Sequence, residues 1–492
     1  MLTMVGLLSA AGLLYLGTLI APISIWAMNF ALMFALALGI DYALFVVNRF
    51  RGALFGHGLS PLDATTVTMD TAGKAVAFSG LTVLVSLSAV MLVPSPAFRS
   101  MSLGIMLAVI FVLAATLTLL PAVLGRLGRR VDKGALPWAH SGEHRSLRFE
   151  RWGERLWRRP VPHGIAALAL LVGLAIPVTQ LRTAMPSIRV VPTSASSYIG
   201  YRQAQQAFGP GATGPLQIVA PAAQATEATR ILSRDRGLAG LLPPQRSHGY
   251  ALITAIPKQD PSSPAVGRTI DRLRRELPKG SLLGGAVAEN HDLQRALAAK
   301  TPIVIAVVLA LGFVLLLVAL QAPLIAAIGV VTNLLATAAA FGIAKWIFQD
   351  GALHSLLGFT PQGFLDAWGP VFFFAMIFAI SMDYTVFLLS SAKEHWDRTG
   401  SARQAMVGGV AHSGRVIFAA GAVMVAVFFT FALSGPLPPK EMGVILGVAV
   451  LLDGALIRLL LLPVLLRLIG RSAWYLPRWL ERMLPDVTFG HS

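Results

Sequence analysis

Ten apolar runs of about 20 residues each divide this chain of 492 residues. A helix of that length covers the roughly 30 Å of hydrocarbon in a bilayer, where backbone polar groups must be satisfied within the helix itself. With 55% hydrophobic and 13% charged residues, the chain is also too apolar for a water-soluble globule. We therefore expect a polytopic α-helical protein of the plasma (inner) membrane. The predicted spans are roughly 3–23, 27–48, 73–93, 100–124, 162–181, 301–320, 322–347, 367–391, 413–434 and 442–466.

Two long polar stretches interrupt the apolar pattern. The first is strongly basic and contains Trp138, Trp152 and Trp157, which predicts a linker on the anionic inner leaflet, with partner binding as the alternative. The second alternates strand-like runs (LQIVA, YALITAI) with helix-like runs, which predicts a small α/β domain of βαβ type. The predicted organisation is a first, incomplete transmembrane repeat of four helices (1–124), a basic cytoplasmic linker (125–161), a transmembrane helix (162–181), a porter-like α/β domain (182–300), a second repeat of five helices (301–470) and a cytoplasmic tail (471–492).

The placement of Lys and Arg orients these segments in the membrane. Arg49 and Arg51, the 125–161 linker and the tail are basic, so the positive-inside rule predicts that they are cytoplasmic. Alternation of ten spans then makes the 182–300 domain extracytoplasmic. Topology also explains the net charge of +17, so membrane lipids are expected partners and nucleic acid is not.

The chain resembles itself at an offset of about 342 residues. GIDYALFVV at 39–47 matches SMDYTVFLL at 381–389, and the apolar runs at 71–87 and 412–428 also match. Both matched halves enter the membrane in the same direction, which predicts parallel repeats related by an axis along the membrane normal. The first half is shorter, and we expect that it lacks two spans and one outer domain, through N-terminal truncation or reduction of the protein.

Each repeat carries an Asp-Tyr pair inside an apolar stretch, and the Asp is the only charged residue there. A charge at bilayer depth costs roughly 2.5–3.5 kcal/mol on insertion scales. Because the chain bears this cost twice at matched positions, we predict a proton relay in a transporter; carboxylates that merely tie helices together are the alternative. The relay residues are Asp41, Tyr42, Asp383 and Tyr384, and the residues predicted on the same helix faces are Phe45, Asn48, Phe387 and Ser390.

Asp453 and Arg458 in the last span have no charged counterparts in the first half, where Phe111 and Thr116 occupy the matching positions. They are expected to extend the relay or to pair with other groups. A spacing of five places them roughly 140° apart on an α-helix, so we do not expect them to pair with each other.

Motifs for enzymatic or ATP-driven chemistry are not apparent in the sequence. It has no cysteine, no G-x-x-x-x-G-K-[ST] phosphate-binding loop, and neither the H-E-x-x-H nor the G-x-S-x-G signature. We therefore expect no catalytic residues, no metal site and no cofactor, with protons as the coupling ion.

Four segments resemble the mycobacterial-membrane-protein-large (MMPL) family of the resistance–nodulation–cell division (RND) superfamily. They are GIDYALFVVNRFR at 39–51, FGPGATGPL at 208–216, MDYTVFLLS at 382–390 and LLDGALIRLLLLP at 451–463. The resemblance implies an RND-type bundle and an exporter of lipids or other hydrophobic molecules, driven by the proton motive force. It also implies that both Asp-Tyr pairs occupy the family's proton-relay positions.

The chain departs from this family in one respect. Family members have twelve spans and two porter-like domains, with the substrate route between those domains, whereas this sequence shows ten spans and one such domain. Two other functions therefore stay open: a non-transporting membrane subunit or sensor, and an RND-type motor that assists protein translocation. A homo-oligomer and accessory membrane proteins are open as partners.

Overall fold

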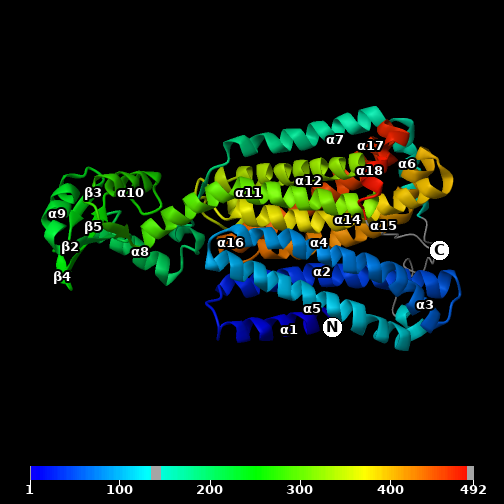
Figure 1. Cartoon of the computed structure of the whole chain (residues 1–492), viewed down its shortest axis with the longest axis horizontal. Coiled ribbons are helices and arrows are strands. Elements are labelled where there is room, and N and C mark those ends of the chain that lie inside the picture. Colours follow the sequence, from blue (N-terminus) through cyan, green and yellow to red (C-terminus); the bar gives the residue numbers. More distant parts are fainter. Residues whose placement is uncertain (1, 134–145, 485–492) are drawn as a thin grey trace.

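The computed structural model describes residues 2–133 and 146–484, which form a long helical bundle with a small α/β domain at one end (Figure 1). Within these ranges, nine helical segments are long and apolar enough to cross a membrane. They correspond to nine of the ten predicted spans. The tenth, at 3–23, is the shorter helix α1 (Leu2–Gly17), which ends before Pro22, a residue that cannot donate a backbone hydrogen bond.

Some helices of the bundle, such as α2 (Ile25–Arg51) and α5 (Pro96–Leu127), extend beyond the predicted apolar runs because their polar ends also continue as helix. The bundle helices of the first half are α2, α3 (Pro61–Thr68), α4 (Lys74–Ser88) and α5. Two helices, α6 (Leu147–Arg158) and α7 (Pro160–Ala175), lead to the α/β domain. The second half contains α11 (Ala286–Leu320), α12 (Pro323–Ala344), α13 (His354–Leu357), α14 (Gly369–Thr399), α15 (Ala402–Ala432), α16 (Leu437–Leu452), α17 (Leu462–Ile469) and α18 (Arg478–Glu481).

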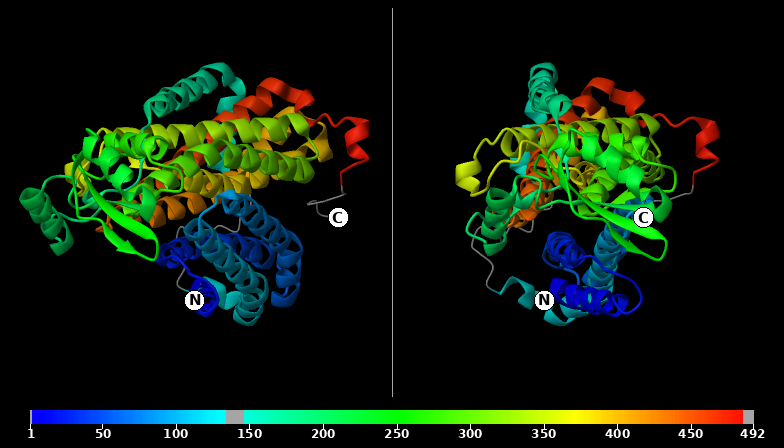
Figure 2. Two further views of the ribbon diagram at one scale, coloured as in Figure 1. Left: turned by 60° about the vertical axis from the view of Figure 1, so that its left-hand side comes forward. Right: turned by 90° about the vertical axis from the view of Figure 1, so that its left-hand side faces the viewer.

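The two halves repeat one arrangement and run in the same direction. The ring of Phe30 in α2 contacts that of Phe372 in α14 (centroids 4.9 Å apart), and Phe45 contacts Phe387 (4.7 Å). Each pair is separated by 342 residues (372 − 30 and 387 − 45), so α2 and α14 lie parallel and in register. Neighbouring contacts repeat as well, since α2 packs on α15 as α14 packs on α4. Figure 2 shows the halves side by side, and the predicted parallel-repeat bundle is confirmed.

The α/β domain contains a sheet with strand order β3-β5-β2-β6, in which every described pairing is antiparallel. Helix α9 links β2 to β3, and α10 links β5 to β6; in each case the linked strands run parallel but are separated by a third strand. The predicted βαβ crossovers are thus present in a split form. The elements are α8 (Ser196–Phe208), β2 (Leu216–Pro221), α9 (Ala225–Arg234), β3 (Leu238–Leu241), β4 (Gln245–Ser247), β5 (Tyr250–Pro257), α10 (Pro264–Glu276) and β6 (Leu282–Gly284).

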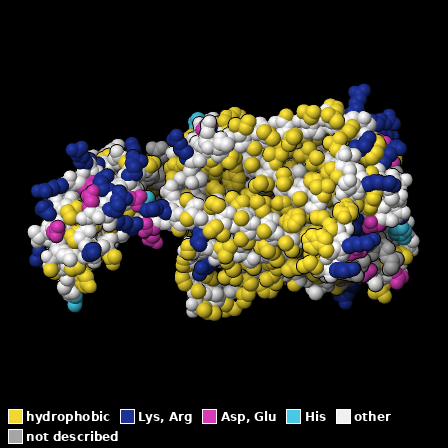
Figure 3. Space-filling view, turned by 45° about the horizontal axis from the view of Figure 1, so that its top comes forward, with side chains coloured by type: hydrophobic (Ala, Val, Ile, Leu, Met, Phe, Trp, Pro, Cys, Tyr) yellow, Lys and Arg dark blue, Asp and Glu magenta, His cyan; other side chains and the backbone are white. Residues whose placement is uncertain are grey.

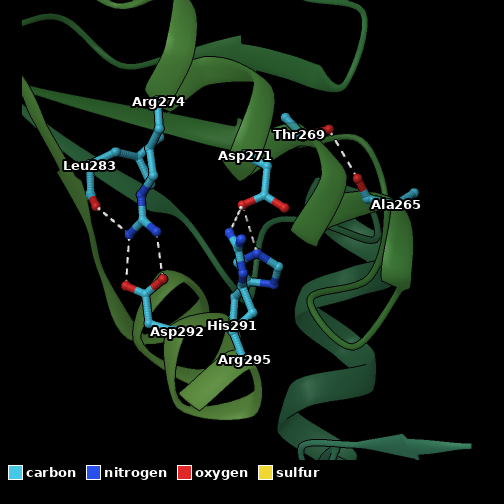
Figure 4. A network of polar contacts seen from close by, with 8 residues as sticks. All are labelled: Ala265, Thr269, Asp271, Arg274, Leu283, His291, Asp292 and Arg295. Atoms are coloured by element: carbon cyan, nitrogen blue, oxygen red, sulfur yellow. Dashed lines mark hydrogen bonds and ion pairs between the residues drawn. The ribbon is translucent and has the colours of Figure 1, made fainter. Parts of the chain in front are cut away.

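Ion pairs hold α10 of this domain against the first turns of α11, which continues without a break into the bundle (Figure 4). Arg274 donates two hydrogen bonds to Asp292 (2.5 and 2.8 Å) and a third to the carbonyl of Leu283 (3.0 Å). Asp271 accepts from Arg295 at 2.7 Å. A second connection is the parallel pairing of β1 (Thr183–Ala184) with β7 (Leu365–Asp366), next to the start of α14.

The basic linker packs on the bundle through α6. The indole of Trp152 donates to the carbonyl oxygen of Leu459 (2.6 Å), and Arg467 lies over the ring of Trp157 at 4.1 Å. These two tryptophans therefore contact protein instead of pointing outward, while Arg151 and Arg155 are exposed. Trp138, also predicted to lie on the inner leaflet, falls outside the described residues.

Apolar side chains cover the outer surface of the bundle, and Lys and Arg gather beyond it, at the end away from the α/β domain and on that domain (Figure 3). Leu8, Ile165, Val331 and Phe418 are each more than 60% exposed. An apolar belt of this extent between charged ends is a surface that faces lipid.

We predict that Arg274→Gln loosens α10 from α11, because it removes a bidentate, charge-assisted contact worth about 1 kcal/mol in a partly exposed setting. Hydrogen–deuterium exchange should become faster in α10 and in the first turns of α11, while the bundle is unaffected. Arg268→Gln, an exposed arginine on the same helix, is the matched control. Unchanged exchange in α10 of Arg274→Gln would contradict this prediction.

Candidate functional site

The centre of the bundle brings the two predicted Asp-Tyr pairs together. Asp41 in α2 and Asp383 in α14 lie at equivalent positions on the facing parallel helices, one turn before the Phe45–Phe387 contact. Asp41 is 8% exposed, and the two carboxyl groups are close enough to interact electrostatically. Two acids at matched repeat positions therefore share one site.

Helix α4 supplies hydroxyl groups to Asp383. The Thr82 hydroxyl donates to Oδ1 of Asp383 (3.0 Å), and Ser79 lies beside the same carboxyl group while donating to the phenol oxygen of Tyr42 (3.1 Å). In the second repeat the positions of Ser79 and Thr82 are taken by Ala420 and Val423. Asp383 therefore accepts from one neutral hydroxyl of α4 and lies beside a second, and neither hydroxyl has a counterpart in the second repeat.

Asp41 faces different groups. The phenol of Tyr384 on the opposite helix lies beside the Asp41 carboxyl group and donates its hydroxyl to the sulfur of Met424 (2.9 Å). The guanidinium of Arg458 lies over the Tyr384 ring, 4.5 Å from its centroid, in cation–π geometry. Arg458 also contributes a favourable charge interaction with Asp41. The phenol thus lies between a carboxyl group and a buried cation.

Asp453 and Arg458 form a buried ion pair, so the prediction that they do not pair with each other is wrong. The reason is local: residues Asp453–Leu461 form a π-helix (η10) between α16 and α17, not an α-helix. Hydrogen bonds in a π-helix join residues five apart, which places side chains at that spacing on one face. Both side chains are nearly inaccessible, with 3% exposure for Asp453 and 2% for Arg458.

Ser381 joins this ion pair to α14. Its hydroxyl donates to Oδ2 of Asp453 (2.9 Å), and its carbonyl oxygen accepts from Arg458. The equivalent residue of the first repeat is Gly39, which has no hydroxyl group to donate. The residues that the sequence analysis missed are Ser79, Thr82, Ser381 and Met424. For the three hydroxyl residues the sequence does contain a signal: Ser79 and Thr82 are polar residues within an apolar helix, and Ser381 replaces the glycine of the first repeat (GIDY against SMDY). Met424 carries no such signal.

The remaining predicted residues lie further along α2 and α14. The rings of Phe45 and Phe387 meet edge to face, with an interplanar angle of 88°, one helical turn beyond the carboxyl groups. Asn48 and Ser390 are half-buried and lie roughly 10 Å from the acids along the helix axis, so the structure does not bring them to the carboxyl groups. Ser390 donates to the carbonyl of Phe387 in its own helix (3.2 Å).

In the described part of the chain, this site combines three acids (Asp41, Asp383, Asp453) with the guanidinium of Arg458. The acids therefore outnumber the cation, and an arrangement of this kind can bind protons. Among the described residues, no group of three or more His, Cys, Asp or Glu side chains is placed to hold a metal ion.

This fold and this site define a multi-pass plasma-membrane protein with an RND-type parallel-repeat bundle. The model of the MMPL family matches residues 1–163 and 247–486, and the chain belongs to that family. It is 35% identical to the mycolic acid-containing lipids exporter MmpL11 of Mycolicibacterium smegmatis over 501 residues, which cover 97% of this chain and 52% of that protein.

Two further proteins are informative. The heme uptake protein MmpL11 of Mycobacterium tuberculosis (strain H37Rv) is 34% identical over 97% of this chain and 51% of its own length. The crystal structure of SecDF, a translocon-associated membrane protein from Thermus thermophilus, superposes with a TM-score of 0.56 at 15% identity, over 94% of this chain and 58% of that one. The chain spans about half the length of the curated relatives it matches.

We predict that Arg458→Met lowers the free energy of unfolding by about 3–5 kcal/mol, because it leaves Asp453 buried without its partner. The double variant Asp453→Leu/Arg458→Met should recover more than half of this loss, since it removes both buried charges. Thermal melting of the detergent-purified variants, followed by tryptophan fluorescence, measures the difference. If the double variant is as unstable as Arg458→Met, the ion pair does not account for the effect.

Proposed function

We propose that this chain is part of, or constitutes, an exporter of lipids or other hydrophobic molecules that is driven by the proton motive force. The observation that carries the proposal is the meeting of Asp41 and Asp383 in matched register at the centre of a membrane bundle, with Tyr384 and Arg458 beside them. Acids at bilayer depth are costly and mark proton pathways in pumps and transporters.

The proposed cycle uses the two halves as rigid bodies. Protonation of Asp41 and Asp383 removes negative charge from the interface between α2 and α14 and weakens the interactions of Asp41 with Tyr384 and Arg458. The helices then repack, and release of protons to the cytoplasm restores the first arrangement. Differential binding of protons in two arrangements is what lets a proton gradient shift the balance between them.

In this proposal the α/β domain is extracytoplasmic and receives the substrate. A hydrophobic substrate is favoured by the name of the Mycolicibacterium smegmatis relative, a lipid exporter, and the name of the Mycobacterium tuberculosis relative extends the class to heme. Membrane lipids are the direct partners. A homo-oligomer or an accessory membrane protein would supply further surface for the substrate route.

A non-transporting subunit or sensor is the second candidate. The described residues contain one α/β domain, and a substrate route between two such domains would need a second. The site argues against this candidate, because a scaffold gains nothing from Asp383, whose Oδ2 has no hydrogen-bond partner in the described part of the chain. A motor that assists protein translocation is the third candidate. Its support is the fold alone, which this chain shares with SecDF.

Proton flux in proteoliposomes tests the proposed relay. With an imposed pH gradient and an enclosed pH-sensitive dye, we predict that Asp41→Asn and Asp383→Asn each reduce the flux more than tenfold, because an amide cannot carry the proton. Glu276→Gln, which neutralises an exposed acid at the end of α10, is the matched control and should stay within twofold of the native chain.

Two results would count against the relay. One is equal proton flux through the native chain and through Asp383→Asn; the other is a native chain that conducts no more than empty liposomes. A native chain whose flux depends on both acids but which moves no fluorescent lipid would instead support the non-transporting alternative.

A further inference from the structure

A second pair of acids lies outside the central site, between β7 and the N-terminal part of α16. Asp366 and Glu441 are both fully buried, each with 0% exposure. The backbone N–H of Asp366 points to Oε2 of Glu441 at 3.4 Å. The neighbouring N–H groups of Leu365 and Ala367 bond instead to β1, at the carbonyls of Arg182 and Ala184 (2.9 and 2.8 Å). Glu441 therefore occupies the edge of β7 that β1 leaves open.

Three of the four carboxyl oxygens of these two acids lack hydrogen-bond partners among the described residues. Both carboxyl oxygens of Asp366 and Oε1 of Glu441 are buried, with no hydrogen bond to any described residue. The side chains of Gln362 and Trp368 lie near Asp366, but not at hydrogen-bond geometry. A buried carboxylate that is neither paired nor hydrogen-bonded costs several kcal/mol, a cost that protonation removes.

Three cationic side chains lie near this pair in the fold, and none of them neutralises it. The ammonium of Lys440, next to Glu441 in the chain, donates to the carbonyls of Leu357 (2.6 Å) and Ala432 (3.4 Å). Lys345, in the helical turn that packs against β7, pairs with Asp350 at 2.7 Å. Arg182, before β1, has an exposed side chain. None of these three is the partner of Asp366 or Glu441.

The position of the pair connects three parts of the molecule. Asp366 lies three residues before α14, which carries Asp383, and Glu441 is the fifth residue of α16, which leads to Asp453. Strand β7 pairs with β1, which precedes the α/β domain. The side chains of α14 from Val371 to Ile380 are apolar, so this helix supplies no polar side chain between the pair and Ser381 of the central site.

We propose that Asp366 and Glu441 form a second proton-binding site, which holds one proton shared between the two carboxyl groups where the α/β domain joins the bundle. One proton makes one acid a donor to the other and leaves a single negative charge in place of two. Loss of that proton places two negative charges side by side, which weakens the contact of β7 with α16.

The direction of the pKa shift of Asp366 agrees with this assignment. Burial raises the pKa of Asp366 to about 7, against the smaller opposing effects of Gln362 and Trp368. A raised pKa means that the folded protein binds the proton more tightly than the unfolded chain does. The contribution of Asp366 to stability is therefore complete below its unfolded pKa of 3.8 and is lost as the pH rises through about 7.

Infrared difference spectroscopy of the purified full chain in lipid nanodiscs tests the proposal through the C=O stretching band of protonated carboxyl groups. We predict a band that disappears with a midpoint near pH 7 in the native chain, and loses intensity in both Glu441→Gln and Asp366→Asn. The band should persist in Asp41→Asn/Asp383→Asn, which separates this site from the central relay. Glu276→Gln is the control for an exposed acid.

Two outcomes would overturn the proposal. One is a titrating band that is unchanged in both Glu441→Gln and Asp366→Asn. The other is loss of the band on addition of Na⁺ or Ca²⁺ at constant pH, which would make the pair a metal-cation site. Melting curves identify any variant that fails to fold, and the other single variant then decides the result.

Discussion

The buried guanidinium of Arg458 is the group around which the centre of this protein is arranged. A cation with 2% exposure inside a membrane bundle is tolerable only with close partners of opposite charge or polarity. Arg458 has three: the Asp453 carboxylate, the carbonyl of Ser381 and the face of the Tyr384 ring. Because two of these partners belong to α14, the cation fixes that helix against η10 and places Tyr384 beside Asp41.

The π-helix η10 places Asp453 and Arg458 on the same face, so that they can form their ion pair. With α-helical geometry, Asp453 and Arg458 would diverge, and each would need a separate partner in an apolar interior. The wider turn aligns them and also changes the pattern of backbone hydrogen bonds in the same segment, where the carbonyl of Leu459 accepts from Trp152 of α6. The basic linker outside the bundle is therefore bonded to the residue that follows the central cation.

The sequence predicted the fold well because the bilayer leaves few choices. Apolar runs of spanning length must be helices, and a repeat offset near 342 places Asp41 against Asp383 once the halves are parallel. The pairing of Asp453 with Arg458 could not be predicted, since it depends on a π-helix whose residues, DGALIRLLL, carry no distinctive pattern. Asp366 escaped notice for another reason: it lies in a connection between spans, and only tertiary contact buries it against Glu441.

Matched positions in the two repeats do not give matched chemistry. Symmetry accounts for where Asp41 and Asp383 lie, but Asp383 is surrounded by hydroxyl groups from α4, whereas Asp41 faces a phenol and a guanidinium from the second half. Substitutions at Ser79, Thr82 and Ser381, relative to their repeat counterparts, produce this difference. Two acids in identical surroundings would have equal proton affinities, so neither would be protonated or deprotonated before the other. Distinct neighbours give each acid its own response to the other's charge, which an ordered sequence of proton transfers requires.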